Sequence, residues 1–415
     1  MSPRASLAPL IGLGLAALLA LACSPVAELL REGDELAGQG KLAEALAKYA
    51  EADTHETETA GGRMRAGALQ LKAAKYEAAV AAFEAALEKV PSSADAYLGL
   101  ARAYQAQAVI PAALQALEKA AQLAPARAEV PLLRGQVLLA QAKPDEALAF
   151  FEQAIRLDAR LGEAHLRRGD VYFSKGDIKE ALRAYNLAIA TSPDNVEATI
   201  QAGRCYLLGG KADKAAATLE GALAKDRRNP WAFYYLGEAQ VQARQVEKAV
   251  LSLQNALRLK PDLGRAYLLL GQIYEKNLLV DRAHDAFQRA VKVSPELLEA
   301  HIALAKAQLE RKDNTGARRT LEGALKAHAD CLPCRVLLGR LHLEQKRFKQ
   351  AVEVLEKVVQ VDYDDNEAHF LLGQAYALLG MLAKATAEYN ALAMANDTAR
   401  ATALLQLIQR KGGGR

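Results

Sequence analysis

Apolar residues recur along this chain at helical spacing, and the whole pattern repeats every thirty-four residues. The segment 264–297, GRAYLLLGQIYEKNLLVDRAHDAFQRAVKVSPEL, contains two amphipathic stretches followed by a proline. Each stretch must bury one apolar face, so the segment predicts a pair of packed helices. Eleven such repeats fit end to end without an inserted or deleted residue. They begin at Val26, Ala60, Ala94, Ala128, Gly162, Val196, Pro230, Gly264, Leu298, Leu332 and Asn366.

Small and large residues alternate at fixed positions of the repeat, counted from its first residue. Position twenty is Ala in every repeat, and position eight is Gly except for Ala101 and Ala305. Position twenty-four is Leu, Phe or Tyr throughout. A larger group at position eight or twenty would strain a close helix crossing by ~1–3 kcal/mol. Glycine at position fifteen in several repeats and proline at position thirty-two in several predict where the two helices end.

With these phased Gly, Ala, aromatic and Pro positions the chain resembles the tetratricopeptide-repeat family from residue 26 to 399. The resemblance implies an all-α, right-handed superhelical α-solenoid of about eleven helical hairpins. It also implies that positions two, five, six, nine, twelve and thirteen of each first helix face a concave groove. Apolar residues recur at helical spacing after residue 399, which predicts a capping helix at 400–411 before a tail at 412–415.

The N-terminal residues differ from the repeats. Residues 1–22 contain Arg4 and an apolar run of about sixteen residues, shorter than the ~20 that a membrane-spanning helix needs, so we interpret them as a signal peptide. Ala20-Leu21-Ala22-Cys23 resembles the lipobox of bacterial lipoproteins, which implies lipidation at Cys23 and leaves 23–25 as a short tether. The alternative is an ordinary secretory signal. Ser24 resembles an outer-membrane sorting residue, so we expect a lipid-anchored protein of the cell envelope that faces the periplasm.

Composition and motifs limit the classes of function that this chain can have. The chain is 51% hydrophobic and 25% charged, with a formal net charge of +4, and its basic residues are dispersed among acids. No polybasic patch for nucleic acid is present in the sequence. There is also no phosphate-binding glycine loop, nucleophile elbow or HExxH zinc motif. We therefore expect no enzyme activity, no cofactor and no metal.

Cys331 and Cys334 form the sharpest local anomaly, a CLPC sequence at the junction of the ninth and tenth repeats. In an exported protein the pair suggests a structural disulfide. Two alternatives remain: an unpaired or regulatory thiol pair, and a zinc site completed by His328 and His342. Cys205 lies at position ten of its helix, where a small buried side chain is expected.

The seventh repeat supplies the candidate binding residues. It begins PWAFYYLGEAQ, so Trp231, Tyr234, Tyr235 and Glu238 occupy groove positions two, five, six and nine, while Phe233 is expected in the core. Arg204 on the preceding first helix and Arg265 on the following one flank the aromatic residues. Aromatic and arginine side chains together are typical of binding hot spots. The alternative is that Trp231 only packs against the neighbouring repeat.

The sequence thus favours a non-enzymatic, membrane-tethered scaffold that binds a protein partner in the groove. Lipoproteins built of such repeats resemble factors that assemble type IV pili and secretin channels, or components of polysaccharide export. A different class of function is a periplasmic binder of polymers or glycans, with Trp231 stacked on sugar rings. A third is an accessory protein of an enzyme that contributes no chemistry itself.

Overall fold

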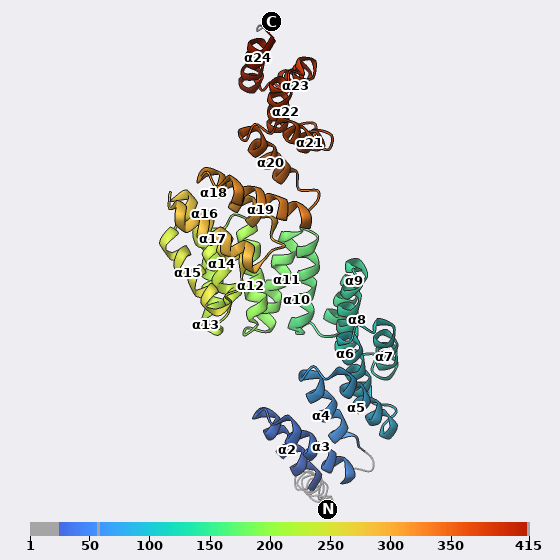
Figure 1. The fold of residues 1–415 in the computed structure, drawn as a ribbon. Coiled ribbons are helices and arrows are strands. Elements are labelled where there is room, and N and C mark those ends of the chain that lie inside the picture. Colours follow the sequence, from blue (N-terminus) through green and yellow to red (C-terminus); the bar gives the residue numbers. More distant parts are fainter. Residues whose placement is uncertain (1–24, 56–58, 413–415) are drawn as a thin grey trace, which may run out of the picture. The chain divides into compact units, whose positions relative to one another are not determined.

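The computed structural model describes residues 25–55 and 59–412, so the predicted signal peptide, Cys23 and Ser24 lie outside the described residues. Within this range the chain forms 23 helices and no strand, which confirms the all-α solenoid class (Figure 1). Contacts divide the chain into two compact units, with the division between Cys205 and Tyr206 inside one helix. We call them the N-terminal and C-terminal units.

The N-terminal unit consists of five helical hairpins and the greater part of a further helix. Its helices are α2 (Pro25–Gly38), α3 (Leu42–His55), α4 (Gly61–Lys72), α5 (Tyr76–Lys89), α6 (Ala94–Ala106), α7 (Ile110–Leu123), α8 (Glu129–Ala140), α9 (Pro144–Leu157), α10 (Gly162–Ser174), α11 (Ile178–Thr191) and α12 (Val196–Leu208), which contains the division. Each first helix packs against the second helix of its hairpin, and successive first helices also touch, as in the pairs α2–α4 and α4–α6.

The C-terminal unit continues the same pattern and ends in an unpaired helix. Its helices are α13 (Ala212–Lys225), α14 (Pro230–Gln242), α15 (Val246–Leu259), α16 (Gly264–Lys276), α17 (Val280–Val293), α18 (Leu298–Glu310), α19 (Asn314–Ala327), α20 (Leu332–Glu344), α21 (Phe348–Val359), α22 (Asn366–Leu378), α23 (Leu382–Met394) and α24 (Thr398–Gly412). From α2 to α22, every first helix begins within one residue of a predicted repeat start.

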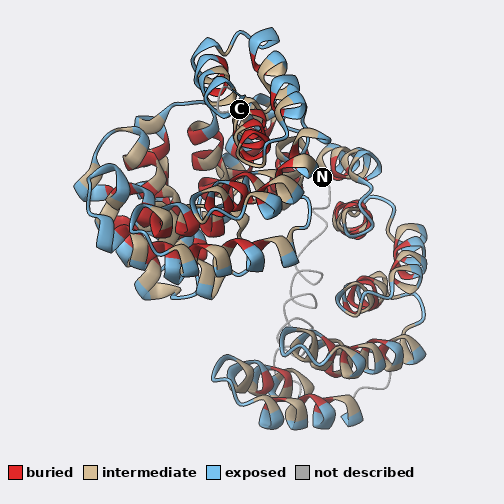
Figure 2. Cartoon of the chain, turned by 45° about the horizontal axis from the view of Figure 1, so that its top comes forward, coloured by how far each residue is buried: buried red, intermediate tan, exposed pale blue. Residues whose placement is uncertain are grey.

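The small residue at position eight packs directly against the large residue at position twenty-four. A Cβ atom added to Gly271 would lie 2.3 Å from Phe287 Cε1, and one added to Gly135 would lie 2.5 Å from the same atom of Phe151. Both phenylalanine rings are fully buried. In the ribbon coloured by burial, the buried residues accordingly lie on the helix faces that meet one another (Figure 2). At Gly135 and Gly271 the glycine is therefore needed for space and not for backbone freedom.

Helix α24 closes the last repeat in a way that the sequence did not reveal. The large residue of that repeat, Tyr389, is only partly buried, and a Cβ on Gly373 would instead lie 2.4 Å from Leu404 Cδ2. Leu404 belongs to α24 and is fully buried. The added helix thus fills, with one leucine, the space that an aromatic or aliphatic side chain fills inside other repeats.

The turn between the two helices has the same backbone conformation in every repeat of this chain. Position fifteen has a positive φ in every repeat, whether it is a glycine such as Gly210 (φ 65°) or a larger residue such as Leu278 (φ 59°). L-residues with a side chain are strained in this conformation. Leu278 is also 85% exposed, so it gains little from packing.

We therefore expect Leu278→Gly to stabilise the C-terminal unit by about 0.5–1 kcal/mol, because the strain is removed while little packing is lost. Urea unfolding followed by the fluorescence of Trp231, the single tryptophan of the chain, measures the change. The matched control is Leu279→Gly at the adjacent residue, whose φ is −88°. The control should destabilise, and equal effects of the two substitutions would contradict the strain argument.

Candidate interaction site

The candidate groove residues of the seventh repeat lie on α14 and form a contiguous aromatic cluster. The ring centroids of Trp231 and Tyr235 are 6.4 Å apart in a stacked arrangement, and those of Tyr234 and Tyr235 are 4.9 Å apart, edge to face. Trp231 and Tyr234 are 6.3 Å apart, also edge to face. We call Trp231, Tyr234 and Tyr235 the aromatic cluster.

The start of α14 explains how Trp231 comes to be presented. Asn229 caps the helix, since its side-chain oxygen accepts hydrogen bonds from the backbone N–H groups of Trp231 and Ala232, each 3.1 Å long. Pro230 occupies the first turn, where its missing N–H costs nothing. This fixed first turn leaves the indole 40% exposed.

The three aromatic residues differ in burial, so packing accounts for the two tyrosines more fully than for Trp231. Tyr234 is only 9% exposed and belongs to a core cluster with Leu253 and Leu270, while Tyr235 packs partly against the same core. Phe233 packs there too, as predicted. Trp231 is the member of the cluster that is exposed. The indole is thus the exposed part of the cluster, and its ring contacts the rings of both tyrosines.

A pocket of about 370 Å³ adjoins the cluster and contains three of the predicted residues. Tyr234, Glu238 and Arg265 line it together, which means that α14 and α16 bring them to one place. Trp231 is next to the pocket through Tyr234 and does not line it. We call this cavity the groove pocket. The remaining lining residues are Leu268, Leu269, Gln272, Leu297 and Glu299.

These additional residues are mostly those that sequence reasoning could have named. Leu268, Leu269 and Gln272 occupy positions five, six and nine of the eighth repeat, and Glu299 occupies position two of the ninth. They stand in the groove positions implied by the family, but their types are unremarkable. Leu297 is different because it is the last residue of its repeat and caps α18 from the junction. No sequence signal marks a junction residue as part of a pocket.

Arg204 lies in the N-terminal unit and has its own partners there. Its guanidinium stacks over the ring of Phe173, 4.5 Å from the ring centroid, and Nη1 donates a 2.6 Å hydrogen bond to Gln201 Oε1. These contacts hold the side chain against α10 and α12. Arg204 thus has a structural role within its unit.

In other repeats, charged side chains at groove positions two, six and nine form ion pairs between neighbouring repeats. Arg340 at position nine pairs with Glu367 at position two of the next repeat. Arg167 binds Glu163 at 2.8 Å and Asp170 at 2.8 Å on its own helix, and Glu197 at 3.1 Å on the next first helix. Such pairs set the spacing of polar groups along the groove.

In two repeats a buried tyrosine donates a hydrogen bond to an aspartate at position nine of the first helix. Tyr49 donates a 2.7 Å hydrogen bond to Asp34, and Tyr185 donates a 2.9 Å hydrogen bond to Asp170. Burial and the bond to Asp34 raise the pKa of Tyr49 to about 12, so the phenol remains a donor. Each pair joins position twenty-four to position nine and was not anticipated from the sequence.

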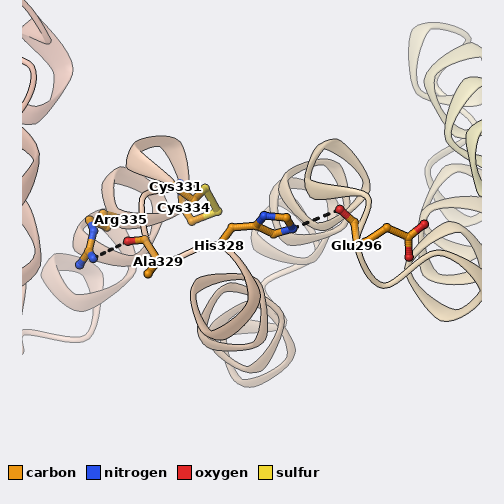
Figure 3. Close-up of a disulfide and its surroundings, with 6 residues drawn as sticks. All are labelled: Glu296, His328, Ala329, Cys331, Cys334 and Arg335. Carbon is orange, nitrogen blue, oxygen red and sulfur yellow. Dashed lines mark hydrogen bonds between the residues drawn. A yellow bond between two sulfur atoms is a disulfide. The ribbon is translucent and has the colours of Figure 1, made fainter. Parts of the chain in front are cut away.

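Cys331 and Cys334 are joined by a disulfide at the start of α20 (Figure 3). Both residues are buried, and Cys331 Sγ accepts a 3.1 Å hydrogen bond from the Cys334 backbone N–H, which caps the helix. Arg335 holds the same turn by donating to the Ala329 carbonyl at 2.8 Å. A disulfide has no thiolate to offer a metal, so in this form the pair cannot be half of a zinc site.

The histidines of the zinc alternative have other surroundings. His328 contacts the backbone oxygen of Glu296 at 3.1 Å through Nε2 (Figure 3). His342 is buried, and burial together with the nearby Arg347 lowers its pKa. Over residues 25–55 and 59–412, no three His, Cys, Asp or Glu side chains are grouped so that they could hold a metal ion. Cys205 is 2% exposed, and burial raises its pKa to about 11.

Two models of the tetratricopeptide repeat match the chain. One matches residues 64–128, 132–196 and 336–403, and the other matches 172–230, 209–273 and 279–341. The chain belongs to the tetratricopeptide-repeat family. Repeats of this family imply a protein–protein interaction scaffold, and its members are in general not enzymes. Among curated proteins, nothing matches at a significant level.

Solved structures with similarity to this chain are themselves helical-repeat proteins. Yeast Tom70 is 16% identical, with 93% of this chain and 95% of Tom70 covered and a TM-score of 0.44. PilF of Pseudomonas aeruginosa is 17% identical, with 50% of this chain and 94% of PilF covered and a TM-score of 0.45. MamA from Desulfovibrio magneticus RS-1 is 23% identical over 40% of this chain and 93% of MamA, with a TM-score of 0.36.

None of the helices in the described part of the chain has the length and apolar character required to cross a membrane.

Proposed function

We propose that this tetratricopeptide-repeat protein is a membrane-tethered scaffold that binds a partner protein at the groove pocket and the aromatic cluster. The observation that carries the proposal is the exposed indole of Trp231 beside a pocket with Glu238 and Arg265. A flat aromatic anchor supplies contact area, and an acid and a base in the adjoining pocket select the orientation of the bound segment.

The pocket has the mixed character that a peptide ligand requires. Leu268, Leu269 and Leu297 give it an apolar wall, while Gln272 and Glu299 offer hydrogen-bonding groups to a peptide backbone. Small cavities of this type take one or two side chains of a longer segment, and the rest of the segment lies along the groove face. The partner in this proposal is an extended or helical segment with an apolar anchor residue.

The tether in this proposal is a lipid on Cys23, which places the scaffold on the outer membrane facing the periplasm. Because only Ser24 and Pro25 separate Cys23 from the first repeat, the repeat array would begin close to the bilayer. The disulfide between Cys331 and Cys334 agrees with an oxidising compartment such as the periplasm. In this proposal the scaffold helps to assemble or stabilise a complex of that compartment, such as a type IV pilus, a secretin channel or a polysaccharide exporter.

Labelling with a palmitate analogue tests the tether. We expect the wild-type protein to incorporate the label and Cys23→Ala to lose it completely, because the thiol is the attachment atom. Cys205→Ala is the matched control and should label like the wild type, since Cys205 is buried. Equal labelling of the Cys23→Ala variant would reject lipidation at this residue.

Affinity capture from envelope fractions tests the groove. Tyr234 is part of the core, so the variant changes the exposed residues only: Trp231→Ala with Arg265→Glu. We expect this variant to recover at least about tenfold less of the partner found with the wild type, because it loses the anchor and reverses the pocket charge. Partners are identified and quantified by mass spectrometry.

The control for capture replaces other exposed apolar side chains far from the groove pocket in sequence. Val361 and Met394 are 74% and 82% exposed, and alanine at both should leave capture and helicity unchanged. If both variants capture the partner equally well, the groove pocket is not the binding site.

The exposed indole also favours a second candidate function, the binding of glycans by ring stacking. A glycan array distinguishes the two. Binding that is lost with Trp231→Ala but kept with Arg265→Glu would point to a sugar ligand, because stacking on a neutral ring does not need the guanidinium.

A further inference from the structure

A second and larger cavity, of about 610 Å³, lies on the C-terminal unit between α15, α16 and α17. Three arginines line it: Arg258 from α15, and Arg282 and Arg289 from α17. The only acid in the lining is Asp285. We call this cavity the basic pocket, and no part of the proposed groove function uses it.

The basic pocket and the groove pocket lie on opposite faces of α16. Arg265, Leu268 and Gln272 line the groove pocket, whereas Tyr267, Leu270 and Tyr274 line the basic pocket. At about 100° per residue these two sets point in roughly opposite directions from the helix axis. A ligand of the basic pocket would therefore not compete with a segment in the groove.

The three arginines have no acidic partner. Within the part of the chain that the structure describes, none of them forms an ion pair, and Arg258 has a single side-chain bond of 3.3 Å to Asn255. All three are exposed. This sets them apart from arginines such as Arg167, whose charge is met by three carboxylates. Three arginines against the single Asp285 leave the pocket lining with a net formal charge of +2, which is available to a ligand.

The walls and floor of the basic pocket suit a peptide. Leu270 and Ala286 are buried and form an apolar floor, and Tyr267 and Tyr274 are half-buried, with phenol groups that can donate to carboxylates. Arg282 and Arg289 are seven residues apart, which spaces them by about 10 Å along α17. An extended chain covers that distance in about three residues.

We propose that the basic pocket binds an acidic, extended segment of a partner protein, and that it is a second interaction surface separate from the groove. Positive charges spread along a helix match several successive carboxylates better than they match one phosphate group. Arginine pairs each carboxylate through two parallel N–H groups, while the tyrosines and the apolar floor hold the backbone and side-chain stems.

Fluorescein-labelled octaglutamate is the probe, with octaglutamine as the uncharged control, and binding to the purified full-length protein is followed by fluorescence anisotropy at low ionic strength. We expect octaglutamate alone to bind. The triple variant Arg258→Gln, Arg282→Gln, Arg289→Gln should weaken binding by at least about tenfold, and added salt should weaken binding to the wild type.

A matched variant changes the net charge equally at other exposed arginines: Arg156→Gln, Arg160→Gln, Arg319→Gln. It should stay within about twofold of the wild type. Equal weakening by both triple variants, or no octaglutamate binding to the wild type, would overturn the proposal. Binding of phosphatidylglycerol vesicles through the same three arginines, without octaglutamate binding, would assign the pocket to lipid headgroups instead.

The groove variant Trp231→Ala with Arg265→Glu separates this proposal from the proposed scaffold function. It should bind octaglutamate within about twofold of the wild type, because Arg265 lies on the other face of α16, Trp231 lies on α14, and neither residue lines the basic pocket. Loss of octaglutamate binding in this variant would show that the two pockets are one site and would contradict the inference.

Discussion

Phe287→Ala should destabilise the C-terminal unit by about 3–5 kcal/mol, the range for a fully buried aromatic side chain whose removal leaves a cavity. Phe287 has no exposed surface and lies in contact range of Gly271 on the facing helix. In an array of repeats each hairpin is stabilised mainly by its neighbours, so the loss should be local to the α16–α17 region. Trp231 fluorescence in a urea titration reports unfolding one repeat away.

A second substitution tests whether Phe287 and Gly271 truly share one space. Gly271→Ala alone should destabilise, because the added methyl would lie 2.3 Å from the Phe287 ring. In the Phe287→Ala background the same methyl enters the cavity and should be tolerated or stabilising. The double-mutant cycle then gives a coupling energy of at least about 1 kcal/mol. Additive effects would mean that the two positions do not face one another.

The repeat pattern predicted the helices well because the packing that defines them is local. Gly271, Ala283 and Phe287 lie within one hairpin, and their sizes must match over a separation of sixteen residues or fewer. The alternation of small and large side chains is therefore written into every thirty-four residues. Leu404 was not predicted to replace Tyr389 because it comes from outside the repeat and obeys no period.

The candidate site was predicted in part, for a related reason. Position in the repeat decides which face of the helix a side chain occupies. The sequence alone therefore assigns Tyr234, Glu238 and Arg265 to one surface, and all three line the groove pocket. How deeply a side chain is buried depends on its neighbours, and the sequence did not distinguish the buried Tyr234 from the exposed Trp231. The sequence also did not show which charged residues pair across repeats. Arg204, for example, stacks on Phe173 of the preceding repeat.

The basic pocket could not be predicted from the sequence at all. Arg258, Arg282 and Arg289 come from two different helices and have no special spacing in the sequence. Dispersed arginines gave no reason to expect a charged site, since the sequence does not show which of them pair with acids. Only the three-dimensional arrangement shows which guanidinium groups lack a carboxylate, and a bulk net charge contains none of this information.

A partly buried charge cluster in the N-terminal unit gives the second large effect. Asp53 receives hydrogen bonds from Lys89 Nζ at 2.6 Å and from Arg63 Nε at 2.8 Å, and its side chain is 18% exposed. Lys89 also donates to the Asp53 backbone carbonyl, and Arg63 to the carbonyl of Ala85 at 2.6 Å. These bonds tie α3, α4 and α5 together and so join the first repeat to the second.

Asp53→Asn should cost about 2 kcal/mol at neutral pH, because it removes the anion that two partly buried cations share, while Arg63 keeps only the exposed Glu88 at 3.5 Å. Burial alone would raise the pKa of Asp53, but the bonds from Lys89 and Arg63 outweigh it and hold the pKa below its ordinary value. A carboxyl group with a lowered folded-state pKa stabilises the protein above its unfolded-state pKa of about 3.9 and loses that contribution as the pH falls through the folded-state value.

The difference in unfolding free energy between wild type and Asp53→Asn should therefore be full near pH 7 and shrink towards zero as the pH drops below about 4. Chemical unfolding followed by circular dichroism measures it, since the single tryptophan lies in the other unit. Asp194→Asn is the matched control, because Asp194 is exposed in the same unit and forms no ion pair within the described residues. A difference that persists at low pH would show that the carboxylate charge is not what stabilises this junction, and that the side chain acts there only through its shape.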